Sequence, residues 1–340
     1  MKFITTTGYY ATGSSAITDL FTEFDNVCSL GMYEYRFLHD PDGISDLEYN
    51  VVENNNRHNT SDAIKRYIKF ASNAKKNGYG TYDIFEDEFE KATEAFIDDI
   101  TELKAKTWWN KDRLDRGRLF CFIDRVYSYA KRLFKGELKT EIRYSLLSDR
   151  ETAYYSAIDD ETFLKAVRKY VDRLFDFANK NKLPYVMVDQ IVPPTNTGRY
   201  LRYFNDIKII VTERDPRDIF LLERNEWKWG VIPVKDVKEY VQWFRITRRF
   251  SNPADEDRSR VLRIQFEDLI YKYDETTAKV IEFAGIDPVH HTSPKSHFDP
   301  ARSIRNTNVA KRYPGCADEI RYIESELKDY LYDFDRYETE

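Results

Sequence analysis

The sequence predicts a three-layer α/β/α fold, with a central parallel sheet and a helical insertion, from three observations. From residue 160 onward, short apolar runs alternate with amphipathic segments, as strands and helices do in α/β proteins. The run IKIIVTER (207–214) is continuously apolar, as expected of a parallel strand covered on both faces. Residues 60–76 and 86–134 carry apolar side chains three and four positions apart, which predicts helices.

The first half supplies two strands and one helix before the alternation is interrupted. Residues 2–7 predict a buried strand and residues 14–24 a helix, and residues 26–38 predict a second strand or a strand and its exit. The helical stretch between residues 50 and 150 then separates this strand from the others. We therefore predict a single domain over residues 1–340, with residues 50–150 as a helical subdomain inserted in it.

The second half supplies the rest of the sheet and its covering helices. Its first helix begins with acidic residues and ends with lysines, which suits the helix dipole. Its last helix ends at Gly285, a residue type that commonly follows a helix C-terminus. Strands are predicted at residues 184–190, 207–214 and 259–269, and helices at residues 160–182, 197–206, 234–250 and 274–285.

The composition excludes several classes of protein. With 340 residues, 41% of them hydrophobic, the chain can bury a large core, and its net charge of −6 is not that of a general nucleic-acid binder. Three cysteines without paired spacing favour a reducing compartment over a disulfide framework or a zinc site. Without a signal-peptide pattern or a run of about 18 apolar residues, we expect a cytoplasmic protein with no transmembrane segment. The adjacent His290 and His291 are expected in a solvated loop, with no metal.

The segment GYYATGSS (8–15) has the layout of a phosphate-binding P-loop between a strand and a helix. Gly8 and Gly13 have the right spacing, but Ser14 stands where nucleotide triphosphatases have lysine. Backbone N–H groups, the helix N-terminus and two serine hydroxyls can still hold an anion there. The alternative is a plain helix start with Ser14 as its N-cap.

Two later segments favour a phosphate site. RDPRD (214–218) follows a buried strand, and arginines at the carboxyl end of a parallel strand face the crevice where α/β sheets bind ligands. The planar guanidinium suits a phosphate monoester. The second segment, VLRIQFEDLIYKYDETTAKVIEFAGID, is a strand, then FEDL, then a helix ending in FAGI.

At these residues the chain resembles the sulfotransferases that use 3′-phosphoadenosine 5′-phosphosulfate (PAPS), in the style of the bacterial and carbohydrate enzymes. Their loop reads K-[ST]-G-[ST]-[ST], where this chain has ATGSS (11–15). Their 3′-phosphate motif reads R-[DN]-P-x-D, matched by RDPRD, and FEDL (266–269) and FAGI (283–286) match the strand and helix that follow. SIRNTNVAKRYPG (303–315) looks like the segment that closes over the nucleotide. The resemblance implies a P-loop-like sulfotransferase fold.

The resemblance also implies how the nucleotide is held. The loop would hold the 5′-phosphosulfate, so neither the lysine of a triphosphate site nor a metal is required, and the product is 3′-phosphoadenosine 5′-phosphate (PAP). The residues implied in nucleotide binding are Gly8, Ala11, Thr12, Gly13, Ser14 and Ser15 in the loop, Arg214 and Arg217 in RDPRD, and Arg305 and Lys311 near the C-terminus.

The chain departs from the family pattern at the loop. Ala11 stands where the family usually has a lysine or arginine that neutralises the transferring group. Its absence leaves three alternatives: weak activity, a cation from elsewhere, or an inactive homologue. Arg36, Lys65 and Arg66 are the candidate replacements. Other departures are Leu222, Asn308 and Ala310, in place of a serine, a glycine and a tryptophan.

Sulfuryl transfer to a hydroxyl group needs a general base near the acceptor oxygen. In the polysaccharide sulfotransferases this base is usually a glutamate in a KE pair after the second strand. Glu34 stands in that place here, with Tyr33 instead of the lysine. Other branches of the family use a histidine, for which His39 and His58 are the alternatives.

Aromatic and amide-rich segments suggest a carbohydrate or glycoconjugate acceptor. Trp227 and Trp229 in EWKWG are the favoured contacts, whereas Trp108 and Trp109 in TWWN are expected to pack in the core of the insertion. Residues 52–59 fit a sugar-binding loop and a plain surface loop equally well. The predicted function is a PAPS-dependent carbohydrate sulfotransferase in which the helical insertion at residues 50–150 forms the acceptor side. The alternatives are an inactive nucleotide-binding homologue and a P-loop nucleotide kinase.

Overall fold

The computed structural model describes residues 1–77 and 80–337, and the chain divides into two compact units. Unit 1 comprises Met1–Asp40, Gly78–Glu88 and Val171–Glu340, and unit 2 comprises Pro41–Asn77 and Phe89–Tyr170. The insertion expected at residues 50–150 lies largely within unit 2. The description of the whole chain as one domain stays a prediction. Among the described residues, no helix has both the length and the apolar composition needed to cross a membrane.

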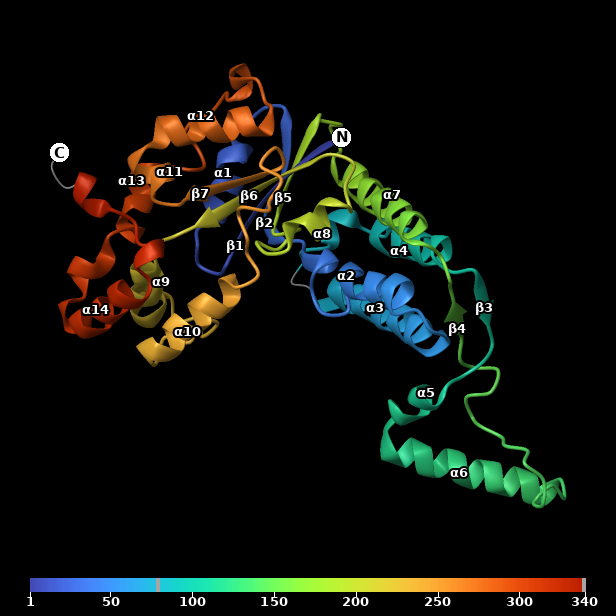
Figure 1. Cartoon of the computed structure of the whole chain (residues 1–340). Helices are drawn as coiled ribbons and strands as arrows, with labels where there is room; N and C mark the ends of the chain where they lie inside the picture. The colour runs from blue at the N-terminus through green and yellow to red at the C-terminus, as the bar shows by residue number, and fades with distance from the viewer. Residues whose placement is uncertain (78–79, 338–340) are drawn as a thin grey trace. The chain divides into compact units, whose positions relative to one another are not determined.

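Unit 1 is built on a five-stranded sheet in the order β2-β5-β1-β6-β7, and every neighbouring pair is parallel (Figure 1). The register places Lys2 opposite Tyr185 and Phe3 opposite Ile207. Because the strands are parallel, their carboxyl ends share one edge, where ligands bind in open α/β sheets. The strands are β1 (Lys2–Gly8), β2 (Val27–Glu34), β5 (Tyr185–Asp189), β6 (Ile207–Glu213) and β7 (Val261–Gln265).

Helices cover both faces of this sheet. On one face, Leu20 of α1 (Ser15–Thr22) and Val280 of α12 (Tyr273–Ala284) share a buried cluster with Ile4 and Ile210 of the strands. On the other face, the ring of Phe175 in α7 (Asp160–Ala178) lies edge-on to Phe3, at 5.5 Å between centroids. This arrangement confirms the predicted α/β fold with a central parallel sheet.

The C-terminal part of unit 1 packs as a second helical cluster. Buried side chains of α9 and α10, such as Phe220 and Tyr240, meet Ile323 of α14 and Val309. The short helix α11 (Asp268–Tyr271) follows β7, and the remaining helices are α8 (Thr197–Leu201), α9 (Pro216–Leu222), α10 (Val237–Arg248), α13 (Pro300–Ser303) and α14 (Ala317–Glu326).

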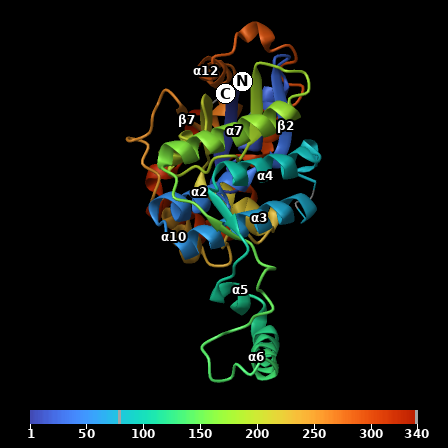
Figure 2. The ribbon, with the colours of Figure 1, turned by 90° about the vertical axis from the view of Figure 1, so that its right-hand side faces the viewer.

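Unit 2 is mainly helical, and α3 lies beside α4 (Figure 2). Tyr67 of α3 meets Phe96 of α4 at 5.7 Å, and Phe96 stacks on Tyr170 at 5.0 Å. A two-stranded antiparallel ladder pairs β3 with β4. The elements are α2 (Ile44–Glu48), α3 (Arg57–Asn77), α4 (Glu88–Asp99), β3 (Leu103–Ala105), α5 (Asn110–Leu114), α6 (Gly117–Phe134) and β4 (Ala153–Tyr155).

Two predicted elements are wrong in detail. Residues 86–134 are not helical throughout, because residues 103–105 form β3 by pairing with residues 153–155, a contact that no local pattern records. The strand predicted at residues 259–269 ends at Gln265, because Asp268–Tyr271 form the short helix α11. Residues 26–38 are a strand and its exit, the second of the two expectations: β2 ends at Glu34, and Arg36–Leu38 form a 3₁₀ turn that buries Phe37 and Leu38.

Candidate active site

The loop between β1 and α1 has an unusual backbone. Tyr10, Ala11 and Gly13 have positive φ angles of 65°, 56° and 83°, so the chain curls on itself before the helix starts. A Cβ atom at Gly13 would lie 2.4 Å from the Phe266 ring, and one at Gly8 would lie 1.9 Å from Thr12 Oγ1. Both positions therefore require glycine.

Side chains at the ends of the neighbouring strands hold this loop. Gln190 Nε2 donates to Ser14 Oγ at 2.9 Å, and Thr7 Oγ1 donates to Gln190 Oε1 at 3.1 Å. Thr6 Oγ1 donates to the Ser14 carbonyl at 3.2 Å. Ser14 occupies the N-cap position of α1, but its hydroxyl makes no hydrogen bond to the backbone of the helix. A plain helix start, in which this hydroxyl caps α1, is therefore not what the structure shows.

A cavity of about 780 Å³ opens above the loop at the carboxyl edge of the sheet. Its walls come from several parts of unit 1: the loop, the ends of β2 and β5, Arg214 of the RDPRD turn, the tryptophans after α9, Phe266 after β7 and the C-terminal segment. The lining side chains include Ser14, Ser15, Asp19, Glu34, Arg36, His39, Asp189, Arg214, Trp227, Trp229, Phe266, Ser303 and Asn306.

Arg214 is the buried cation of this cavity. Its NH1 donates to the Ala11 carbonyl at 2.9 Å and its NH2 to the Asn306 carbonyl, and the guanidinium lies 4.7 Å from the centre of the Phe266 ring. Its Nε has no hydrogen-bond partner among the described residues. Burial lowers the pKa of Arg214, although the carboxyl groups of Asp218, Glu267 and Asp215 oppose the shift. A bound anion would relieve the desolvation of this cation.

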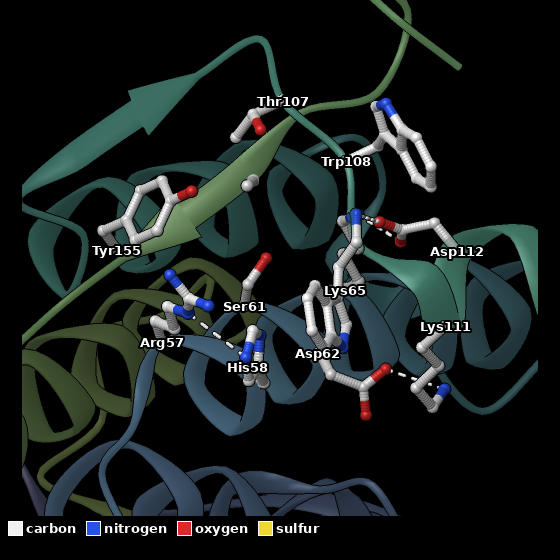
Figure 3. Close-up of a pocket in the computed structure, with 12 residues that line it drawn as sticks. Arg57, His58, Ser61, Asp62, Lys65, Thr107, Trp108, Lys111, Asp112 and Tyr155 are labelled. Carbon is white, nitrogen blue, oxygen red and sulfur yellow. Dashed lines mark hydrogen bonds and ion pairs between the residues drawn. The ribbon is translucent and has the colours of Figure 1, made fainter. Parts of the chain in front are cut away.

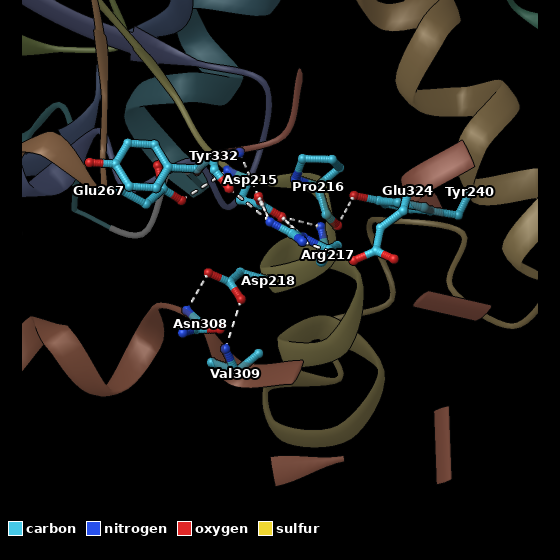
Figure 4. A network of polar contacts seen from close by, with 10 residues as sticks. All are labelled: Asp215, Pro216, Arg217, Asp218, Tyr240, Glu267, Asn308, Val309, Glu324 and Tyr332. Atoms are coloured by element: carbon cyan, nitrogen blue, oxygen red, sulfur yellow. Dashed lines mark hydrogen bonds and ion pairs between the residues drawn. The ribbon is translucent and has the colours of Figure 1, made fainter. Parts of the chain in front are cut away.

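The other charged residues of RDPRD hold the surrounding chain (Figure 4). The Asp218 carboxylate accepts from the backbone N–H groups of Asn308 and Val309, both at 2.9 Å. Arg217 donates to Asp215 and to Glu324, with N–O distances of 2.7 and 2.9 Å. Asp218 therefore attaches the C-terminal segment to this turn, and Arg217 is engaged outside the cavity lining.

The C-terminal segment reaches the cavity through residues that the sequence did not single out. Ser303 and Asn306 line it, whereas Arg305 and Lys311 are exposed and are not among the lining residues. The position of this segment fits the resemblance, but its two predicted phosphate-binding cations do not line the cavity.

Glu34 lies at the cavity wall, where β2 ends opposite Asp189 of β5. Its Oε2 pairs with Arg36 NH1 at 3.0 Å, and Arg36 Nε also pairs with Asp40 at 3.2 Å. Arg36 is the one candidate replacement cation in the cavity lining. Lys65 and Arg66 belong to unit 2.

Asp189 is a cavity residue that the sequence reasoning missed. It is buried, and its Oδ1 has no hydrogen-bond partner among the described residues. Burial, with smaller contributions from the charges of Glu34 and Asp19, raises the pKa of Asp189 to about 8. The available signal was an aspartate at the carboxyl end of an apolar parallel strand.

His39 also lines the cavity, where its Nε2 lies 2.8 Å from the Gln190 carbonyl oxygen. A carbonyl only accepts, so Nε2 carries the proton, and neutral His39 keeps its lone pair on Nδ1. Burial lowers the pKa of His39, which favours this neutral form. His39 therefore has the protonation state of a base.

Trp227 and Trp229 stack on each other at the cavity wall, with 5.1 Å between ring centroids. Trp227 also lies 5.3 Å from the Arg214 guanidinium. Trp229 as a residue is 63% exposed, and both tryptophans line the cavity, so this pair contributes aromatic surface to its wall.

His58 lies in unit 2, in a separate pocket of about 190 Å³ (Figure 3). Its ring stacks on Trp109 at 3.6 Å, and Arg57 Nε donates to His58 Nε2 at 3.1 Å. Lys65 pairs with Asp112 at 2.5 Å in the same pocket. Trp108 and Trp109 line this pocket and Trp109 is exposed, so the expectation of core packing for TWWN is wrong.

The two adjacent histidines of the loop after α12 have separate carboxylate partners. His290 Nδ1 lies 2.7 Å from Asp25, and His291 Nε2 lies 2.7 Å from Glu23. His291 is largely covered and stacks on Phe24, so the expected solvated loop holds only for His290. Among the described residues, no cluster of three or more His, Cys, Asp or Glu side chains is arranged to hold a metal ion.

Comparisons with known proteins identify the family to which this chain is similar. A family model described as "Sulfotransferase family" matches residues 59–290. Among solved structures, the crystal structure of sulfotransferase STF1 from Mycobacterium tuberculosis H37Rv aligns over 90% of this chain and 76% of that one, with 11% identity and a TM-score of 0.35. No curated protein matches the sequence significantly.

Proposed function

The chain belongs to the sulfotransferase family, and from this premise we propose that it transfers the sulfuryl group of PAPS to a hydroxyl group of a carbohydrate or glycoconjugate. One observation carries the proposal. The phosphate-type loop, the buried Arg214 and two carboxyl groups, those of Glu34 and Asp189, line the same cavity. These are the components that a phosphorylated donor and a proton-accepting base require.

The donor is held from two sides in this proposal. The backbone N–H groups of residues 8–15 and the hydroxyls of Ser14 and Ser15 bind the 5′-phosphosulfate at the N-terminus of α1. Arg214 binds the 3′-phosphate with its planar guanidinium. Arg36 supplies the charge that the family places at the position of Ala11, since it lines the cavity close to Glu34. No metal takes part.

Glu34 is the proposed base. It removes the proton from the acceptor hydroxyl while the oxygen forms its bond to sulfur and the bond from sulfur to the 5′-phosphate oxygen breaks, which releases PAP. The raised pKa of Asp189, about 8, keeps that neighbouring carboxyl protonated near neutral pH, so the pair carries one negative charge and not two. His39 is the alternative base, through Nδ1.

The acceptor surface is the aromatic pair Trp227 and Trp229. Stacked indoles offer the flat apolar surface on which sugar rings pack, and Trp229 is exposed for that contact. The reaction belongs to a reducing, cytoplasmic compartment in this proposal, because Cys28, Cys121 and Cys316 are all free thiols.

Calorimetric titration with PAP, AMP and Mg-ATP tests the donor site. We expect tight binding of PAP alone, and Arg214→Ala weakens it by about 10- to 100-fold, the usual loss for a hydrogen bond to a charged group. Arg305→Ala is the matched control, because Arg305 is exposed and is not a lining residue. Preference for Mg-ATP, or an equal loss in both variants, contradicts the proposed donor site.

Transfer of labelled sulfate from PAPS to a panel of oligosaccharides tests the reaction. We expect product with the wild-type chain and none with Glu34→Gln, which keeps the size of the side chain and removes its basicity. If PAP binds but no acceptor is sulfated, the chain is an inactive homologue. If Glu34→Gln is fully active, His39→Asn becomes the decisive variant.

A further inference from the structure

The helix α6 in unit 2 exposes its apolar face. Seven apolar side chains are exposed, with Leu119 at 73% and Phe134 at 90% of their full accessible area. The exposed apolar residues of α6 are Leu119, Phe122, Ile123, Val126, Tyr129, Leu133 and Phe134. At 100° per residue they fall on one stripe about 140° wide.

On its opposite, polar face, α6 is hydrogen-bonded to the chain that follows it. The course of that chain can be traced in Figure 1. Asp124 accepts hydrogen bonds from Ser145 Oγ at 2.9 Å and from Leu146 N at 2.6 Å. Tyr144 N donates to Ser128 Oγ at 3.1 Å. Along the whole of α6, all of which is described, Asp124 is the one buried side chain. The helix is thus anchored by its polar face and presents its apolar face outward.

This surface is also strongly basic. Residues 116–139 carry seven Lys and Arg side chains against two Asp and Glu, within a chain whose net charge is −6. Arg118, Arg125 and Arg132 recur every seven residues, so they form a row along one edge of the apolar stripe. Arg118 and Arg125 are exposed and have no ion pair with another described residue.

We propose that α6 binds the surface of a membrane containing anionic lipid, with its apolar stripe in the acyl region and its arginine row among the headgroups. A basic helix with a wide apolar face and little overall hydrophobicity lies in the plane of such a surface. A second copy of the chain is a poorer occupant, because pairing two α6 helices would bring two surfaces of net positive charge together. An anionic membrane offers an acyl region to the apolar stripe and negatively charged headgroups to the arginine row.

Vesicle flotation of the full chain tests this. We expect flotation with phosphatidylcholine vesicles that contain phosphatidylglycerol, weakened by salt, and little flotation with phosphatidylcholine alone. Phe122→Asp with Phe134→Asp lowers the partition coefficient about 100-fold or more, since each buried phenylalanine contributes at least a tenfold factor. Arg118→Gln with Arg125→Gln lowers it about 20- to 30-fold, at about fivefold for each arginine.

Phe250→Asp is the matched control, because Phe250 is 71% exposed in unit 1 and lies outside the helix. We expect the Phe250→Asp variant to float with anionic vesicles as well as the wild type does. Three results overturn the proposal: no flotation with anionic vesicles, equal flotation of the Phe122/Phe134 variant, or a stable dimer in sedimentation that the same variant dissociates. The last result would assign the stripe to a second copy of the chain.

Discussion

Helices α1 and α6 are both amphipathic in sequence, yet the structure uses their apolar faces in opposite ways. In α1, Ile17, Leu20 and Phe21 are fully buried against the sheet of unit 1, and the helix N-terminus is left to the cavity. In α6, the apolar face is exposed and Asp124 is buried. Periodicity therefore establishes that a helix has an apolar face, but not what that face meets.

The same contrast holds for two glycines, Gly13 in the loop just before α1 and Gly117 at the first position of α6. Gly13 and Gly117 have almost equal φ angles, 83° and 84°. A Cβ atom at Gly13 would meet the Phe266 ring, whereas at Gly117 it would meet nothing within 4 Å. The loop before α1 is closely packed around its glycine, and the start of α6 is open.

The largest expected effect comes from the leucines of the two helices. Leu20→Ala removes a fully buried side chain and lowers the free energy of unfolding by about 3–5 kcal/mol. Leu119→Ala removes an exposed side chain and changes the free energy of unfolding by less than about 0.5 kcal/mol. Urea unfolding followed by circular dichroism measures both. A loss at Leu119 as large as that at Leu20 would break the comparison, because α6 would then be packed in solution.

The glycine pair gives the next largest difference. Gly13→Ala combines an unfavourable φ with a clash against an aromatic ring and lowers stability by about 2–4 kcal/mol. Gly117→Ala introduces only backbone strain, because a Cβ atom there meets no other atom, and it lowers the free energy of unfolding by about 1 kcal/mol. Urea unfolding of the two variants separates the cost of the positive φ angle, which both share, from the cost of the clash with the Phe266 ring. Equal losses would mean that the Phe266 ring moves aside without cost.

A smaller, local effect is expected at the anchored face of α6. Asp124→Ala leaves the Ser145 and Leu146 donors unpaired and weakens the attachment of the helix by about 1–3 kcal/mol. Hydrogen exchange of residues 117–134 should speed up accordingly. Asp115→Ala is the control, since Asp115 is exposed and makes only an ion pair with Lys111. Unchanged exchange in Asp124→Ala would show that other contacts hold α6 in place.

The sequence predicted the elements whose side-chain pattern is local. The strands β1, β5, β6 and β7 were identifiable because each is a short run rich in apolar and β-branched residues. The β3–β4 ladder was missed because its partners lie about fifty residues apart, where no local pattern can pair them. TWWN was assigned to a core because aromatic residues are usually buried, and sequence gives no exposure.

The candidate site was predictable to a similar extent. The loop and Arg214 were found by spacing, and both line the cavity. Arg217, Arg305 and Lys311 shared the same motifs but do not line it, because spacing does not fix the direction of a side chain. Asp189 was not identified, since its raised pKa results from burial and from charges brought close by folding.

Asp189 and Asp124 extend the comparison to two buried carboxyl groups. Asp124 has two hydrogen-bond donors, whereas Asp189 Oδ1 has none among the described residues. Asp189→Asn should therefore stabilise unit 1 at neutral pH. Between the ordinary pKa of 3.8 and about 8, the unfolded chain carries this carboxyl ionised while the folded protein keeps it protonated. Over that window, Asp189 lowers the stability of the wild type as pH rises.

The gain from Asp189→Asn should grow from pH 4 to pH 8 and level off above it, because both states of the wild type are then ionised. The difference between variant and wild type in urea unfolding isolates this group from Glu267 and Asp218, whose pKa values are also raised. Glu34→Gln should shift the upper end of the window downward, since it removes one neighbouring charge. A gain independent of pH would mean that Asp189 is ionised in the folded protein, and Asp189 would then replace Glu34 as the first candidate for the base.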